Sequence, residues 1–219
     1  MSISSFEQLL NADIWGELSS VLTGLKHWRH YPIFDEALGS LNTAALYQSR
    51  MHGQDHTQRV LLLAALLAYW DRLSAENTHL LLLAASYHDV GRQNDGYDIE
   101  HGIRSAEQIG ALTGLTGEAL KMVQAMVGAH SRPDARMEET LRLYRPEDFH
   151  RTMGLAGYLK DADGLDRVRI QDLDLSYLRH ESAEGLIPFA ELLLHNSRKY
   201  GLAEELPALC REKSRRRQS

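Results

Sequence analysis

The chain has 219 residues, a formal net charge of −6 and 43% hydrophobic residues, which fits one globular domain with a sizeable core. Its single cysteine, Cys210, excludes an internal disulfide and a cysteine-rich zinc module. The sequence has no run of about 18 apolar residues and no signal-peptide pattern. We therefore expect a cytoplasmic protein without a membrane partner.

Leucine and alanine fill most apolar positions, and no stretch alternates apolar and polar residues over the length of a strand. These features predict an all-α fold, a single-domain helical bundle. The predicted helices cover, in chain order, residues 4–22, 35–50, 54–73, 75–89, 101–112, 116–130, 134–144, 146–162 and 188–200. The segment 92–100, rich in Asn, Asp and Gly, is predicted to be a loop.

The predicted elements group into three parts. Residues 1–44 form an N-terminal helical segment that packs on the core, residues 45–205 form the main domain, and residues 206–219 form a basic tail. Because the chain as a whole is acidic, we interpret this tail as a solvated end and expect no nucleic-acid partner.

Histidine is unusually frequent, with 11 residues, and some histidines occur where a buried site could form. His56 lies near the start of an apolar helix, His88 and Asp89 lie at the end of the next, and Asp163 lies at the end of a later one. Imidazole and carboxylate together suit Zn, Mn or Fe. A single histidine at a helix end is, however, more often hydrogen-bonded than metal-bound.

The local sequences around these residues resemble the HD superfamily of metal-dependent phosphohydrolases. The segment 52–60 (HGQDHTQRV) is similar to its first motif, 84–92 (AASYHDVGR) to its His-Asp-Ile-Gly motif, and 161–166 (DADGLD) to its last motif. The resemblance spans roughly residues 45–180. It implies a helical HD domain with a metal held by His56, His88, Asp89 and Asp163.

Two further histidines resemble later motifs of the superfamily. His101 follows the His-Asp motif by 12 residues and His130 closes a predicted helix. The resemblance implies either that they hold a second metal or that they act on substrate and water around one metal, for example by protonating the leaving oxygen. The expected cofactor is therefore one or two divalent ions of Mn, Fe or Zn.

Other polar residues near the motifs are candidates for catalysis or substrate binding. Arg92 and Lys160 suit contacts with a phosphate, and Asp166 either orients Asp163 or touches substrate. The remaining candidates for substrate binding are His52, Tyr177 and Arg179. The simpler interpretation is a surface charge for Arg92 and Lys160, a local salt bridge for Asp166, and a capping or supporting role for His52.

The resemblance implies a phosphohydrolase that cleaves a phosphate ester of a nucleotide or other small metabolite with metal-activated water. Gly91, Arg92 and Gln93 stand where some relatives carry an acid after His-Asp, which argues against the guanosine tetraphosphate hydrolase and deoxyribonucleoside 5′-monophosphatase patterns. Two alternatives stay open, a di-iron oxygenase of the same fold and a non-catalytic binding module. Homodimerisation is also left open.

Overall fold

Helices account for all the regular structure of residues 3–204, the part of the chain that the computed structural model describes. The prediction of an all-α fold is thus confirmed. The predictions for Cys210 and for the basic tail fall outside the described residues. The α-helices are α1 (Phe6–Asn11), α2 (Ser19–His27), α3 (Tyr31–Gly39), α4 (Gln54–Trp70), α5 (Ala75–Tyr87), α6 (His101–Ala106), α7 (Ile109–Thr113), α8 (Gly117–His130), α9 (Met137–Leu143), α10 (Phe149–Leu165), α11 (Glu181–Gly185) and α12 (Ile187–Lys199).

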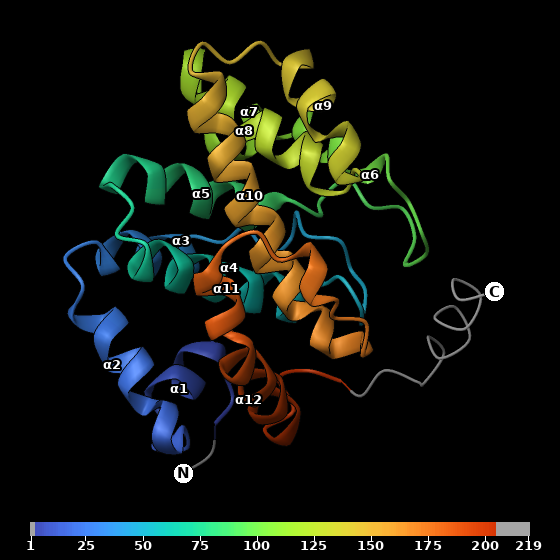
Figure 1. Cartoon of the computed structure of the whole chain (residues 1–219). Coiled ribbons are helices and arrows are strands. Elements are labelled where there is room, and N and C mark those ends of the chain that lie inside the picture. Colours follow the sequence, from blue (N-terminus) through green and yellow to red (C-terminus); the bar gives the residue numbers. More distant parts are fainter. Residues whose placement is uncertain (1–2, 205–219) are drawn as a thin grey trace.

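Helix α4 is the centre of the bundle. All of its residues from Val60 to Ala68 are buried, so this stretch of the helix is apolar on every face and has no solvent side. Helices α5 and α10 pack against α4, and α8 packs against both α5 and α10 (Figure 1). The functional candidates lie where these four helices meet.

The predicted helix 54–73 is close to the observed α4, and the predicted helix 75–89 is close to α5. Ser74 caps α5, since its hydroxyl accepts a hydrogen bond from the backbone N–H of Asn77. The segment 92–100 has no helix, as predicted.

The prediction of one helix over residues 4–22 is wrong. Helix α1 ends at Asn11, and a 3-10 turn, η1 (Gly16–Leu18), precedes α2. Gly16 has φ 53°, a left-handed conformation that interrupts a helix. The break lets the Trp15 indole stack on Phe189 of α12 with ring centroids 5.4 Å apart.

The predicted helices 35–50 and 101–112 also differ from the structure. Helix α3 begins earlier, at Tyr31, because Pro32 is tolerated in a first helical turn, and residues 40–53 are irregular. The second stretch is divided into α6 and α7 at Glu107 and Gln108. Hydrophobic spacing was similar on both sides of these breaks, so periodicity could not locate them.

None of the helices within residues 3–204 combines the length and apolar character that crossing a membrane requires.

The turn that follows α4 contains an arginine in a conformation that normally favours glycine. Arg72 follows the C-cap residue Asp71 and has φ 54°. The next N–H, that of Leu73, donates to the carbonyl of Ala68, which closes the turn. A left-handed conformation costs a residue with a side chain about 1–2 kcal/mol.

We expect Arg72→Gly to raise the stability of the protein by up to about 1 kcal/mol, because relief of the backbone strain exceeds the added entropy of the unfolded chain. The measurement is chemical denaturation with Arg145→Gly, a second residue at positive φ, as the comparison. A lower stability of Arg72→Gly than of wild type would show that the side chain contributes more than the strain costs.

Candidate metal centre

The four residues predicted to bind metal come together from three central helices. His56 lies in the first turn of α4, His88 and Asp89 directly follow α5, and Asp163 lies near the end of α10. His56, His88 and Asp89 are buried, whereas the Asp163 side chain is 27% exposed and marks the side open to solvent. The helix ends thus bring a group of polar side chains together at the edge of an apolar core.

His56 is central to a first group of possible ligand atoms. Its Nε2 atom lies 3.2 Å from His88 Nε2, 3.6 Å from Asp89 Oδ2 and 3.4 Å from Asp163 Oδ1. His56, His88 and Asp163 can offer their atoms to one ion.

A second group forms on the other side of Asp89. His101 begins α6 and His130 ends α8, and their Nε2 atoms are 2.9 Å apart. Asp89 Oδ1 lies 3.0 Å from His101 Nε2 and 3.4 Å from His130 Nε2. The two oxygens of Asp89 therefore face two different pairs of imidazoles.

The backbone fixes the tautomer of three of these imidazoles. Nδ1 of His88 lies 2.9 Å from the carbonyl of Ala85, Nδ1 of His130 lies 2.6 Å from that of Val127, and Nδ1 of His101 contacts the carbonyl of Asp98. A carbonyl oxygen only accepts hydrogen bonds, so each Nδ1 carries the proton. Each Nε2 then presents a lone pair toward Asp89, as a ligand requires.

His56 is oriented by a carboxylate instead of a carbonyl. Its Nδ1 lies 2.7 Å from Asp166 Oδ2, and Asp166 also accepts from Arg59 Nε at 2.6 Å and from Arg59 Nη2 at 3.0 Å. Arg59 and Asp166 are each only 1% exposed. This buried pair contacts the Nδ1 side of His56, whereas Nε2 faces His88 and Asp163, and it fixes the orientation of the ring.

Protonation in the centre favours cation binding. Burial lowers the pKa of His88 to about 4, so its imidazole is neutral at neutral pH. Burial also lowers the pKa of His130. Burial alone would raise the pKa of Asp89, but the neighbouring His88 and contacts with the other imidazoles hold it well below its usual value. The Asp89 carboxylate is thus ionised beside the neutral imidazole of His88.

Asp163 and His56 are also influenced by this cluster. His56 and His88 outweigh the effect of burial and lower the pKa of Asp163. Burial and Arg169 oppose protonation of His56, but hydrogen bonds with Asp166 and Asp89 raise its pKa above the usual value. A cation held by these side chains would replace that proton as the partner of His56 Nε2.

One oxygen of the Asp89 carboxylate has no hydrogen-bond donor. Asp89 Oδ1 is buried and accepts no hydrogen bond from residues 3–204, although two imidazole nitrogens lie within 3.4 Å of it. Those nitrogens carry lone pairs and cannot donate. An anionic oxygen facing lone pairs in a buried site is costly unless a cation lies between them. The donor set of four imidazoles and two carboxylates fits one or two transition-metal ions.

Arg92 and Lys160, the two residues predicted to contact phosphate, lie in different surroundings from each other. Arg92 Nε donates to Asp89 Oδ2 at 2.8 Å, so this guanidinium lies at the centre. Lys160 Nζ instead bonds the carbonyls of Ala129 and His130, at 3.4 and 3.3 Å, and pairs with Asp134 at 3.1 Å. Lys160 therefore binds the end of α8 and fixes the backbone that carries His130. Its contact with substrate stays a prediction.

The other predicted substrate contacts are not all brought together. His52 is buried, packs edge-on against His56 and contacts Asp95 Oδ1 at 3.1 Å. Arg179 pairs with the buried Asp161, and Tyr177 is 54% exposed with no contact to the metal-binding candidates. Their role toward substrate stays a prediction.

Sequence reasoning missed Arg59 and Arg169, which surround Asp166. Arg59 lies one turn after His56 and was part of the first motif, so the signal was present. Arg169 donates to the backbone carbonyls of Met51 and Asp166, at 3.0 and 3.1 Å. The Arg59–Asp166 and Arg169–Met51 contacts join residues that are 107 and 118 positions apart in the chain. Local sequence spacing therefore gives no sign of them.

Comparison with known families agrees with this geometry. A family model of the HD domain matches residues 53–168, which is more than half of the chain. The match includes His56, His88, Asp89, His101, His130 and Asp163. The chain therefore belongs to the HD domain family, whose members form a superfamily of metal-dependent phosphohydrolases. Searches of curated proteins and of solved structures found no match.

Replacing Asp166 by Asn should weaken metal binding by about 10–100-fold, because the amide retains a hydrogen bond to His56 Nδ1 but loses the charge that makes the imidazole a stronger ligand. Equilibrium dialysis against Zn or Mn measures this affinity. Asp55→Asn is the matched control, since the Asp55 side chain also pairs with Arg59, at 3.1 Å, but forms no hydrogen bond with the His56 ring. Equal affinities of the two variants would contradict the assigned role.

Lys160→Met should lower the affinity for metal at the His101–His130 side and leave the His56–His88 side intact, because it frees the end of α8. We expect a loss of about 1–3 kcal/mol of stability as well, since the carbonyls of α8 lose a charged donor. Titration with Co²⁺, followed by its ligand-field absorption, separates the two steps. A uniform weakening of both would argue against a local effect.

Proposed function

We propose that the protein hydrolyses a phosphate ester of a nucleotide or another small phosphorylated metabolite, with two divalent transition-metal ions that the residues around Asp89 would hold. The observation that carries this proposal is the Asp89 carboxylate, whose two oxygens face His56 and His88 on one side and His101 and His130 on the other. Membership of the HD domain family supports metal-dependent hydrolysis.

Each ion would have its own ligands in addition to Asp89. His56, His88 and Asp163 would hold one, and His101 and His130 would hold the other. When bound, such ions lower the pKa of water toward about 7 and stabilise charge on the phosphoryl oxygens. In both His101 and His130, Nδ1 donates a hydrogen bond to a backbone carbonyl and Nε2 faces Asp89. This geometry favours metal ligation over proton transfer as their role.

The remaining polar groups would position the substrate. Arg92 places a guanidinium beside Asp89, where it can form paired hydrogen bonds with a non-bridging phosphate oxygen. Burial and the nearby Arg169 lower the pKa of His52 to about 3, so this imidazole is neutral and suits a hydrogen bond to substrate rather than proton donation. Asp163, the most exposed ligand, lies on the side from which substrate would approach.

The test is metal content combined with phosphate release. Wild type should hold about two transition-metal ions per chain and release phosphate from nucleotides or generic phosphate esters. His130→Ala should hold about one ion and lose activity by at least about two orders of magnitude, since the second ion's share of charge stabilisation is removed.

His195→Ala is the matched control, because His195 is an exposed histidine of α12 outside the centre. It should keep both ions and full activity. A wild-type protein that binds no Mn, Fe or Zn would refute the proposed function, and so would His130→Ala with unchanged hydrolysis.

A di-iron oxygenase is the second candidate, favoured by the complete set of six ligands from His56 to Asp163. Arg92 at the bridging carboxylate suits an anionic phosphate and supports hydrolysis instead. Iron-loaded protein that consumes oxygen with a small organic substrate, and releases no phosphate from esters, would establish the oxygenase.

A further inference from the structure

Helix α6 is too short to fix the position of His101 by itself. It has six residues, and a helix of this length is not stable on its own in water. The first amides of a helix have no partner inside it and are usually capped by the side chain just before the helix. Glu100 holds that place, but within residues 3–204 its side chain caps no amide of α6. Contacts with the rest of the fold must therefore hold His101, the first residue of the helix.

A serine from another helix supplies the missing cap. Ser131 directly follows α8, and its Oγ atom accepts a hydrogen bond from the backbone N–H of Gly102 at 3.2 Å. The same Oγ donates to the carbonyl of Ile99, just before α6, at 2.8 Å. Gly102 follows His101 in the chain, and Ser131 follows His130. One hydroxyl thus ties together the residues next to both histidines of the second ligand group.

The absence of a side chain at Gly102 lets the two segments come close enough for this contact. A Cβ atom at this position would lie 2.6 Å from Ser131 Oγ, 2.7 Å from the carbonyl oxygen of Val127 and 3.0 Å from that of Gly128. The last two atoms belong to the backbone of α8 and cannot rotate away as a side chain can. Any larger residue in place of Gly102 would therefore push α6 away from α8.

A second serine hydroxyl holds α6 against the turn that carries Asp89. Ser105 is fully buried, and its Oγ accepts a hydrogen bond from the backbone N–H of Gly91 at 2.8 Å. Helix α6 is thus fixed both to this turn and to the end of α8. The two contacts explain how His101 comes to lie with its Nε2 3.0 Å from Asp89 Oδ1 and 2.9 Å from His130 Nε2.

We propose that Ser131 is a positioning residue for the second metal ion. By capping α6 from the end of α8, it sets the separation of His101 and His130 and so determines whether the chain holds one ion or two. The assignment rests on the proposed function, since it treats this histidine pair as metal ligands. The ligands of the first ion lie on α4, directly after α5 and on α10, so loss of the cap should weaken the second ion selectively.

Stepwise binding of Mn²⁺ to the full chain tests this role. Ser131→Ala should weaken binding of the second ion by about 10–100-fold and leave the affinity for the first unchanged, as expected when a contact that orients a ligand is removed. Gly102→Ala should lose the second ion more completely, because its Cβ meets the backbone of α8. Electron paramagnetic resonance distinguishes the two states, since a pair of neighbouring Mn²⁺ ions gives an exchange-coupled spectrum and an isolated ion gives resolved hyperfine lines.

Two variants control for the general effects of these changes. Ser197→Ala also removes a buried serine hydroxyl, one that donates to the carbonyl of Leu193 at 2.8 Å within α12, and should bind both ions as wild type does. Gly154→Ala adds a Cβ to a glycine of α10 that has no described atom within 4 Å of that position. It should likewise keep both ions and the exchange-coupled spectrum.

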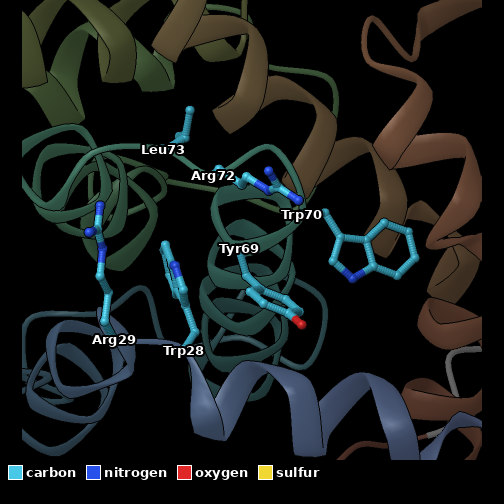
Figure 2. Close-up of a pocket in the computed structure, with 6 residues that line it drawn as sticks. All are labelled: Trp28, Arg29, Tyr69, Trp70, Arg72 and Leu73. Atoms are coloured by element: carbon cyan, nitrogen blue, oxygen red, sulfur yellow. The ribbon is translucent and has the colours of Figure 1, made fainter.

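Tryptophan emission reports unfolding separately from the metal centre. Trp28 and Trp70 line a surface pocket at the opposite end of α4 from His56 (Figure 2), and Trp15 is buried against Phe189. Trp70 lies 14 residues after His56 on α4, about 21 Å at the usual rise of about 1.5 Å per residue. Loss of the second ion in a variant whose emission matches that of folded wild type therefore cannot be attributed to unfolding.

Three results would overturn the role of Ser131. Wild-type affinity for both ions in Ser131→Ala and Gly102→Ala would leave the two-ion centre intact and remove only the positioning role. Equal weakening of both ions in Ser131→Ala would show a general structural effect instead. A wild-type chain that binds a single Mn²⁺ ion, or none, would overturn the two-ion form of the proposed function and the role of Ser131 with it.

Discussion

The candidate centre depends on hydrogen bonds that lie behind the histidines. Each of the four imidazoles gives its Nδ1 proton to an oxygen on the side away from Asp89, a backbone carbonyl for His88, His101 and His130 and the carboxylate of Asp166 for His56. The Nε2 atoms of His88, His101 and His130 therefore present lone pairs to the buried carboxylate of Asp89. An anionic oxygen that faces lone pairs in a buried site favours a cation between them.

The fold explains why the site lies where it does. Helices α4 and α5 are apolar nearly all round and must be covered by α8 and α10, so their ends meet at the surface of one core. Polar residues at those ends can therefore converge while the middle of each helix stays apolar. Behind them lies a buried ion pair, Arg59–Asp166, in which each charge is matched with direct hydrogen bonds.

Much of this could be predicted from the sequence. The all-α class followed from leucine and alanine content, and the family from three motifs around His56, His88 and Asp163. Helix breaks at Gly16 and after Gly39 could not, because hydrophobic spacing continued across them. Nor could the sequence show what Lys160 contacts. It was predicted to lie near the site because it is one helical turn before Asp163. In the structure its amine instead binds carbonyls at the end of α8, a contact between distant segments.

The central claim is that the Asp89 carboxylate joins two metal ions. Anomalous diffraction from crystals of the full chain loaded with Mn or Zn tests it most directly. The account predicts two anomalous peaks about 3.5–4 Å apart, one beside each oxygen of Asp89, with His56, His88 and Asp163 at one and His101 and His130 at the other. A single peak with His101 and His130 unbound, or ions located away from Asp89, would contradict it.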